Sequence, residues 1–154
     1  MIRGEKTIQV SVVGGSNPDP ETVALAVEVG KVVAEKGAVL ICGGLGGVME
    51  AAARGAKEKG GLTIGILPGY DGESANRFID VEVRTGLGHG RNILVAASGD
   101  ILIALPGSHG TRSEVSVGLL LGKRVIGVKA WGTISGVRQV NSLRELKTEL
   151  MPIF

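Results

Sequence analysis

Three glycine-rich segments contain the residues whose types and spacing most directly suggest chemistry. They are GGSN at 14–17, GGLGG at 43–47 and PGSHGT at 106–111. Glycine lets a backbone turn tightly and approach a ligand closely, and a helix that follows presents unpaired N–H groups to an anion. The segments together predict a phosphate or nucleotide site. Its expected residues are Gly14, Gly15, Ser16, Asn17, Gly43, Gly44, Gly46, Gly47, Pro106, Gly107, Ser108, Gly110 and Thr111.

Ordinary tight turns between strands and helices, with nothing bound, are the alternative for these segments. The number of glycines argues against it, because turns alone do not need 26 glycines in 154 residues. At Gly110 in particular we expect the backbone to approach the anion, so that a β-branched side chain there would block binding.

The elements that must position these segments are short apolar runs that alternate with helical patterns. Strands are predicted at 8–13, 38–42, 62–67, 80–84, 101–105 and 125–128, and helices at 21–36, 48–59, 91–97, 112–121 and 143–150. Strand–helix alternation is typical of a parallel sheet, and nearly continuous apolar strands indicate that both of its faces are covered. We therefore expect an α/β protein: one Rossmann-like, doubly wound domain over 1–154, with its ligand outside the carboxyl ends of the strands.

Composition excludes several classes of function. Seventeen basic and 15 acidic residues are mixed along the chain, and four aromatic residues are too few for a base-stacking platform, so no nucleic-acid partner is expected. The single Cys42 cannot form an intramolecular disulfide. No apolar run is long enough to cross a membrane. We expect a cytoplasmic protein with no membrane contact, no metal and no resident cofactor.

Several better-known motifs do not fit. The dinucleotide signature G-x-G-x-x-G fails because Met49 occupies its last position. Ser108 lies beside His109, but no G-x-S-x-G turn surrounds it, so a serine hydrolase is disfavoured. His89 and His109 have no third ligand at a recognisable spacing, which disfavours a metal site.

Two of the glycine-rich segments resemble the signatures of the LOG-like proteins of the SLOG superfamily, long labelled possible lysine decarboxylases. The segment PGSHGTRSE at 106–114 resembles their P-G-G-x-G-T-x-x-E motif, and GGLGGVME at 43–50 resembles their other glycine-rich signature. The likeness runs from about Ile8 to Val128. It implies a Rossmann-like nucleotide binder that forms a homodimer or a larger homo-oligomer. The best-known members remove ribose 5′-phosphate from nucleoside monophosphates such as cytokinin nucleotides.

The resemblance also implies roles for individual residues. Arg91 and Asn92 occupy the place of the arginine that those enzymes pair with the motif glutamate, here Glu114. A ligand phosphate would then lie over Gly107 to Thr111 with Arg91 beside it, and Glu114 and Arg91 would be the catalytic residues of an enzyme. A purely structural role is the alternative: Glu114 would favour the first turn of its helix, and Arg91 would pair with a surface carboxylate.

The chain departs from the enzymes of this family at several positions. Ser108 replaces the second glycine of the motif, and Ser113 stands where many members have a further glutamate. Its short length and its Gly-Arg-Asn sequence resemble the branch of the molybdenum-cofactor carrier proteins, which bind without turnover. Two hypotheses follow: a carrier-like binder of a nucleotide or pterin-type cofactor, or a nucleoside 5′-monophosphate phosphoribohydrolase. Lysine decarboxylation is not expected, because no lysine occupies a recognisable pyridoxal phosphate site.

Apolar residues on two predicted helices suggest self-association. In the predicted helix 112–121, apolar residues cover a wider face than a helix needs in order to pack on a sheet. The predicted helix 21–36 also has apolar residues on two sides. We expect a homo-oligomer, most simply a two-fold dimer, to bury these faces. The alternative is that the irregular segments 70–78 and 131–136 cover them within one chain.

Overall fold

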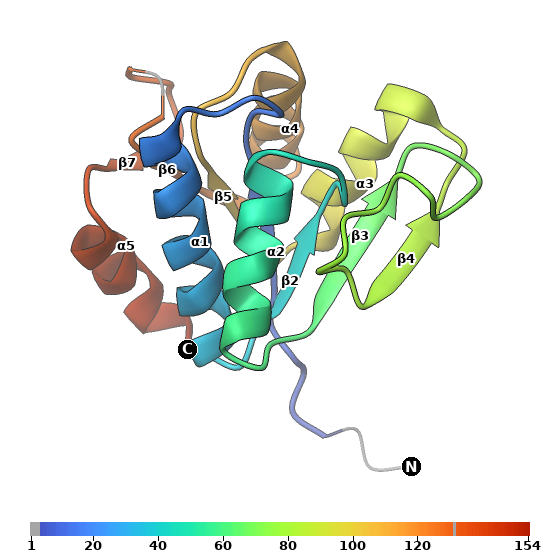
Figure 1. Ribbon diagram of the computed structural model, residues 1–154. Helices are drawn as coiled ribbons and strands as arrows, with labels where there is room; N and C mark the ends of the chain where they lie inside the picture. Colours follow the sequence, from blue (N-terminus) through green and yellow to red (C-terminus); the bar gives the residue numbers. More distant parts are fainter. Residues whose placement is uncertain (1–3, 131) are drawn as a thin grey trace.

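The computed structural model describes residues 4–130 and 132–154 and contains one seven-stranded parallel sheet between two layers of helices (Figure 1). The strands are β1 (Gln9–Val13), β2 (Val39–Cys42), β3 (Thr63–Leu67), β4 (Val81–Arg84), β5 (Ile101–Ala104), β6 (Arg124–Val128) and β7 (Val137–Val140). The helices are α1 (Pro20–Glu35), α2 (Val48–Glu58), α3 (Arg91–Ser98), α4 (His109–Leu120) and α5 (Leu143–Leu150), with short 3-10 turns at Gly88–Gly90 and Met151–Ile153.

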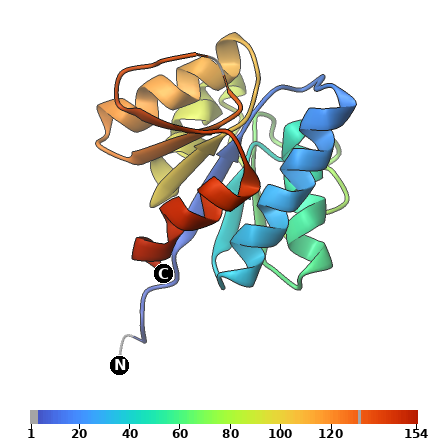
Figure 2. The same ribbon diagram turned by 90° about the vertical axis from the view of Figure 1, so that its left-hand side faces the viewer.

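The strand order is β4-β3-β2-β1-β5-β6-β7, and every pair of neighbours is parallel. Helices α1, α2 and α5 cover one face, and α3 and α4 cover the other (Figure 2). The chain reverses its direction of winding between β1 and β5, which lie side by side at the centre. The predicted Rossmann-like α/β fold is confirmed, and its ligand crevice is expected at this reversal.

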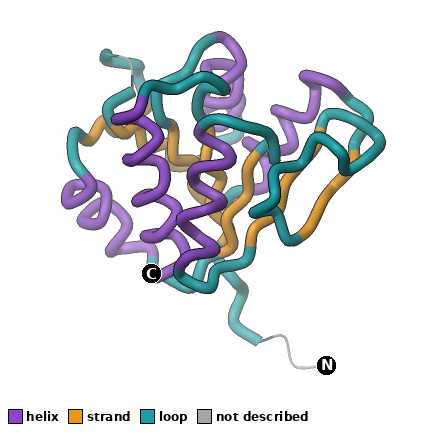
Figure 3. Tube along the Cα trace, viewed as in Figure 1, coloured by secondary structure: helices purple, strands orange, loops and turns teal. Residues whose placement is uncertain are grey.

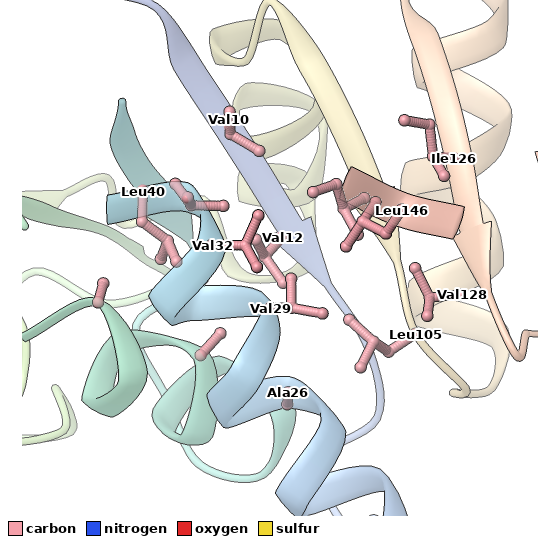
Figure 4. Close-up of a cluster of buried hydrophobic side chains, with 14 of the residues drawn as sticks. Val10, Val12, Ala26, Val29, Val32, Leu40, Leu105, Ile126, Val128 and Leu146 are labelled. Carbon is pink, nitrogen blue, oxygen red and sulfur yellow. The ribbon is translucent and has the colours of Figure 1, made fainter. Parts of the chain in front are cut away.

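Buried aliphatic side chains fill both layers. On the α1 side, Val12 of β1 and Leu40 of β2 meet Val29 and Val32 of α1, and Leu146 of α5 lies over Ile126 (Figure 4). A second cluster on the other face joins residues of the sheet to α3 and α4. The central strands are therefore buried on both faces, which explains why their sequences are nearly continuous apolar runs.

Helices α1 and α2 approach each other so closely that their backbones touch. A Cβ atom at Gly30 would lie 1.9 Å from the carbonyl oxygen of Ala52, and one at Gly55 would lie 1.9 Å from that of Val27. The apolar band that we expected α1 to offer to a partner is instead covered within the chain, since Val29 is fully buried. That expectation was wrong because small residues let α2 cover the second side of α1.

Two further differences from the predicted elements concern helix α4 and strand β7. Helix α4 begins at His109 rather than at residue 112, so the end of the third glycine-rich segment belongs to the helix. Strand β7 follows the segment 132–136, where no strand was expected. Of the segment predicted to be irregular at 131–136, residue 131 lies outside the described residues. In the part of the chain that the structure describes, no helix has the length and apolar character needed to span a membrane.

Candidate functional site

The three glycine-rich segments meet at the carboxyl edge of the sheet, where the loops gather at the top of Figure 3. Gly15 joins them: its N–H donates to the carbonyl oxygen of Pro106 at 2.9 Å, and its own carbonyl oxygen accepts from the Val48 N–H at 3.0 Å. One residue of the β1 loop is thus bonded both to the β5 loop and to the start of α2. The predicted convergence of the segments is seen directly in these bonds.

Close backbone packing explains the glycines at the centre of this junction. Gly47 has φ +69°, and a Cβ there would lie 2.4 Å from the Gly15 carbonyl oxygen. A Cβ at Gly107 would lie 2.1 Å from Oγ1 of Thr111. These glycines are therefore required by contacts within the protein.

The remaining glycines of the segments divide into packed and open positions. Three positions are packed. A Cβ atom added at Gly14 would lie 2.5 Å from Cγ1 of Val48, and one added at Gly43 would lie 2.7 Å from Nη2 of Arg91. A Cβ atom added at Gly44 would lie 2.5 Å from Cδ2 of Leu67. Gly46 has open space around it, and at Gly110 the nearest atom, Nδ2 of Asn92, is 3.7 Å away. Gly110 also has no positive φ, so its backbone conformation does not require glycine, and the approach of an anion to this position stays a prediction.

The N-terminus of α4 lies on the third segment. Arg112 donates the first intrahelical hydrogen bond, to the Ser108 carbonyl oxygen at 3.0 Å, so the N–H groups of His109, Gly110 and Thr111 precede the hydrogen-bonded ladder of the helix. The Ser108 side chain does not cap them. The Ser113 hydroxyl donates to the Gly110 carbonyl oxygen at 2.6 Å. This helix end offers N–H donors and a positive dipole end to an anion.

A pocket of about 330 Å³ lies between the first and third segments. Its lining residues are Gly15, Ser16, Asn17, Pro18, Asp19, Thr22, Pro106, Gly107 and Ser108. Asn17 and Ser16 are exposed on its rim. The pocket opens on the α1 side of the sheet edge, whereas the next group of expected residues lies on the α3 and α4 side. The predicted site therefore has two halves that share the β5 loop.

The second half is a buried cluster between α3 and α4. The side chains of Arg91, Asn92, Thr111 and Glu114 are 4–8% exposed, and Nη1 of Arg91 donates to Oδ1 of Asn92. Arg91 also packs against Gly43 at the end of β2. Arg91 thus does not pair with a surface carboxylate, which removes the structural alternative that we considered for it.

The charges of this cluster are incompletely paired. Among the described residues, Arg91 and Glu114 share neither an ion pair nor a hydrogen bond, and the buried Nε of Arg91 has no hydrogen-bond partner. Burial raises the pKa of Glu114 to about 7, although the nearby Arg91 opposes the rise. Burial also lowers the pKa of Arg91, while Glu114 and Cys42 oppose that change.

Asn76 contacts the second glycine-rich segment, although no motif in the sequence predicts that contact. Its N–H donates to the Gly44 carbonyl oxygen at 2.9 Å, and its Nδ2 donates to that of Leu45 at 2.8 Å. The irregular segment 70–78 therefore holds the second glycine-rich segment in place, and does not cover α4 as we had considered. Only the fold brings these residues together, because they are about thirty positions apart in the chain.

Within the described residues, no cluster of three or more His, Cys, Asp and Glu side chains could hold a metal ion. Ser108 and His109 lie at the start of α4, in the cap position and the first helical position respectively. The chemistry that the site offers is therefore binding of an anionic group by N–H donors and a guanidinium, next to one buried carboxyl group.

Comparison with known proteins agrees with this geometry. Residues 7–151 match the SLOG cluster4 family. An uncharacterised protein of Archaeoglobus fulgidus is 47% identical over 86% of this chain and 87% of its own length. The cytokinin riboside 5′-monophosphate phosphoribohydrolase of Mycobacterium tuberculosis is 32% identical over 89% of this chain and 78% of its own length.

Solved structures show the same fold over nearly the whole chain. The molybdenum cofactor binding protein of Rippkaea orientalis has a TM-score of 0.91 and 32% identity, with 97% of this chain and 99% of that chain covered. The molybdenum cofactor carrier protein of Chlamydomonas reinhardtii has a TM-score of 0.88 and 28% identity, with 96% and 98% covered. The chain therefore belongs to the SLOG cluster4 family.

Proposed function

We propose that this protein binds a small phosphate-bearing ligand, a nucleoside monophosphate or a pterin-type cofactor, and holds it without turnover as a carrier does. The observation that carries the proposal is Nε of Arg91, the one buried side-chain nitrogen or oxygen atom of the described residues that lacks a hydrogen-bond partner. Buried donors are nearly always paired, and a bound anion would supply the acceptor that this donor lacks.

The surroundings of Arg91 favour an oxyanion as that acceptor. Asn92, to which Arg91 is bonded, is the nearest neighbour of the open position at Gly110 in the first turn of α4. A phosphate over Gly107 to Thr111 would meet the helix N–H groups, with Arg91 supplying charge-assisted hydrogen bonds. The relatives support the two ligand classes, because one is named for a nucleoside monophosphate and two for the molybdenum cofactor.

The placement of Glu114 next to Arg91 favours a second candidate, a phosphoribohydrolase. With the ligand phosphate at the α4 end, the Glu114 carboxylate would stabilise the oxocarbenium-like C1′ or activate water there. The N-glycosidic bond would then break, and its electron pair would leave with the base. This role needs an ionised Glu114, and burial raises its pKa to about 7, so about half of these carboxyl groups would be ionised at neutral pH in the free protein.

A matched pair of variants at Gly110 tests the position of the anion. Gly110→Asp is expected to abolish binding of AMP, because its carboxylate would occupy the helix end and repel a phosphate. Gly110→Asn has nearly the same shape without the charge and is expected to retain binding. The Cβ atom of either residue has room. Thermal-shift titration measures this, since a ligand at 100 times its dissociation constant adds about 2.7 kcal/mol to the free energy of unfolding.

A panel of nucleoside monophosphates and pterin phosphates, run on the wild-type protein in the same assay, identifies the class of ligand. Equal shifts for the Asp and Asn variants would place the anion away from α4. No shift with any phosphate-bearing compound in the wild-type protein would contradict the proposed function itself.

We also propose that the protein is a homo-oligomer, most simply a two-fold dimer. Helices α3 and α4, on the same face of the sheet, leave large apolar side chains in solvent: Ile93 is 54% exposed and Leu120 is 84% exposed. Residues 132–134 line a common pocket of about 360 Å³ with Arg112, Val115 and Ser116 of α4, and Leu120 remains exposed. Such surfaces commonly mark interfaces, and a symmetric dimer buries the same patch on both copies.

Light scattering at micromolar concentration is expected to give a multiple of 15.8 kDa. A Leu120→Lys variant places a charge in the exposed patch and should shift that mass toward the monomer. A wild-type mass near 15.8 kDa would contradict the oligomer.

A further inference from the structure

Arg91 and Glu114 are two opposite charges buried near each other without direct contact. Each side chain is less than 10% exposed, and Nε of Arg91 has no partner among the described residues. In an ordinary buried ion pair the two charged groups are in direct contact, because a buried charge without a partner destabilises the folded protein. An acceptor from outside the chain would supply the partner that Nε of Arg91 lacks.

The groups that face Glu114 can be named for each element around it. Helix α3 contributes Arg91, and β2 contributes Cys42, whose thiol stays protonated because burial raises its pKa to about 12. Strands β5 and β6 pack against α4. Strand β5, which is Ile-Leu-Ile-Ala, contributes no titratable group, and β6 contributes Arg124, which is exposed and donates to Glu149. On α4 itself, His109 and Arg112 are exposed. Arg91 is therefore the one buried cation of the described residues next to this carboxyl group.

An anion that binds to Arg91 competes with the Glu114 carboxylate for the same positive charge. With Glu114 ionised, the buried cluster would hold one cation, one carboxylate and the anion, and repulsion between the two negative groups would be poorly screened at this depth. With Glu114 protonated, that repulsion disappears, and the neutral carboxyl can itself donate a hydrogen bond to an oxyanion. The electrostatics therefore favour the protonated state whenever the anion is present.

We propose that this site binds its anion together with one proton, which is carried by the Glu114 carboxyl group. The inference rests on the proposed function, since it concerns the same anion site, and it adds a condition for loading and release. The balance is simple: the ionised site, one proton and one dianion give a complex in which Glu114 is neutral. No covalent bond forms or breaks.

The direction of the pH dependence follows from this balance. At low pH Glu114 is already neutral, so the anion binds without taking up a proton and affinity is highest. Above about pH 7, where the free site has lost this proton, each bound anion must take one from solution. Affinity then falls by up to about tenfold for each further pH unit, as linkage requires for one proton.

Sulfate is the probe, because it remains a dianion across this range whereas phosphate titrates near neutrality. Calorimetric titration of the wild-type protein is expected to show affinity for sulfate falling about tenfold from about pH 7.5 to about pH 8.5. In Glu114→Gln, whose amide imitates the neutral carboxyl group, the fall should disappear. His109→Gln should keep it, which excludes the imidazole at the start of α4 as the source.

The number of protons taken up on sulfate binding can be measured on the wild-type protein, which tests the proposal without any variant. At about pH 8, titrations in buffers of different ionisation enthalpy should show about one proton taken up for each sulfate bound. Sulfate binding that is independent of pH, or a fall of equal size in Glu114→Gln, would overturn the proton coupling while leaving the binding function intact. Absence of sulfate and AMP binding even at about pH 6 would overturn the proposed function and the coupling with it.

Discussion

Gly55→Ala is expected to lower the free energy of unfolding by about 2 kcal/mol or more. The added methyl group would lie 1.9 Å from the carbonyl oxygen of Val27, and backbone atoms cannot move aside as a flexible side chain can. The overpacking that pushes α1 away from α2 lowers the free energy of unfolding by about 3 kcal/mol. The higher helix propensity of alanine raises it by about 1 kcal/mol. Gly30→Ala should behave alike, because it meets the Ala52 carbonyl oxygen at the same distance.

Urea unfolding followed by circular dichroism measures this effect. Gly110→Ala is the matched control, since Gly110 also lies in a helix but its Cβ position is free of close contacts. We expect the control to leave stability unchanged or to raise it slightly. A Gly55→Ala protein as stable as the control would mean that the two helices do not touch as described.

Wild-type protein that binds AMP is expected to leave it intact at pH 7, with no free adenine released. The reason lies in Glu114, which the proposed proton coupling keeps neutral in the complex with a bound phosphate. A neutral carboxyl group cannot stabilise an oxocarbenium-like C1′. Chromatographic detection of adenine after long incubation is the measurement.

Release of adenine would establish the phosphoribohydrolase instead. In that case Glu114→Gln should slow release by about 10²–10⁴-fold while AMP binding persists, because the phosphate contacts survive. The wild-type rate should also rise as pH increases through 7, since the reaction needs the ionised carboxyl group. Release that Glu114→Gln leaves unchanged would indicate a contaminating activity.

Most of the fold follows from local patterns in the sequence. Helix α1 begins at Pro20, one residue before the predicted range 21–36, and the Asp19 side chain caps it by accepting from the Thr22 N–H at 2.7 Å. Helix α5 occupies the predicted residues 143–150. Strand β7 was missed because Val-Arg-Gln-Val is short and half polar, as suits an edge strand, and lacks the apolar run of the central strands. The start of α4 was missed because Gly110 suggests a loop.

The site could be predicted only in part. Glycine clusters and family resemblance indicated the three segments and the association of Arg91 with Glu114. They did not indicate that Nε of Arg91 would lack a hydrogen-bond partner, because that depends on side-chain placement across two helices. They assigned glycines such as Gly107 to ligand contact, which stays a prediction, and did not indicate that close packing against Thr111 also requires glycine there.

The two hydrogen bonds of Gly15 have a consequence for the dynamics of the site. Because this one residue joins the β5 loop to the start of α2 by hydrogen bonds, opening of either segment around the proposed anion site is coupled to the other. Their conformational entropy is already lost when the chain folds, so little remains to be lost when a ligand arrives. Loading and release should therefore be controlled by charge within a nearly rigid frame, rather than by the opening and closing of loops.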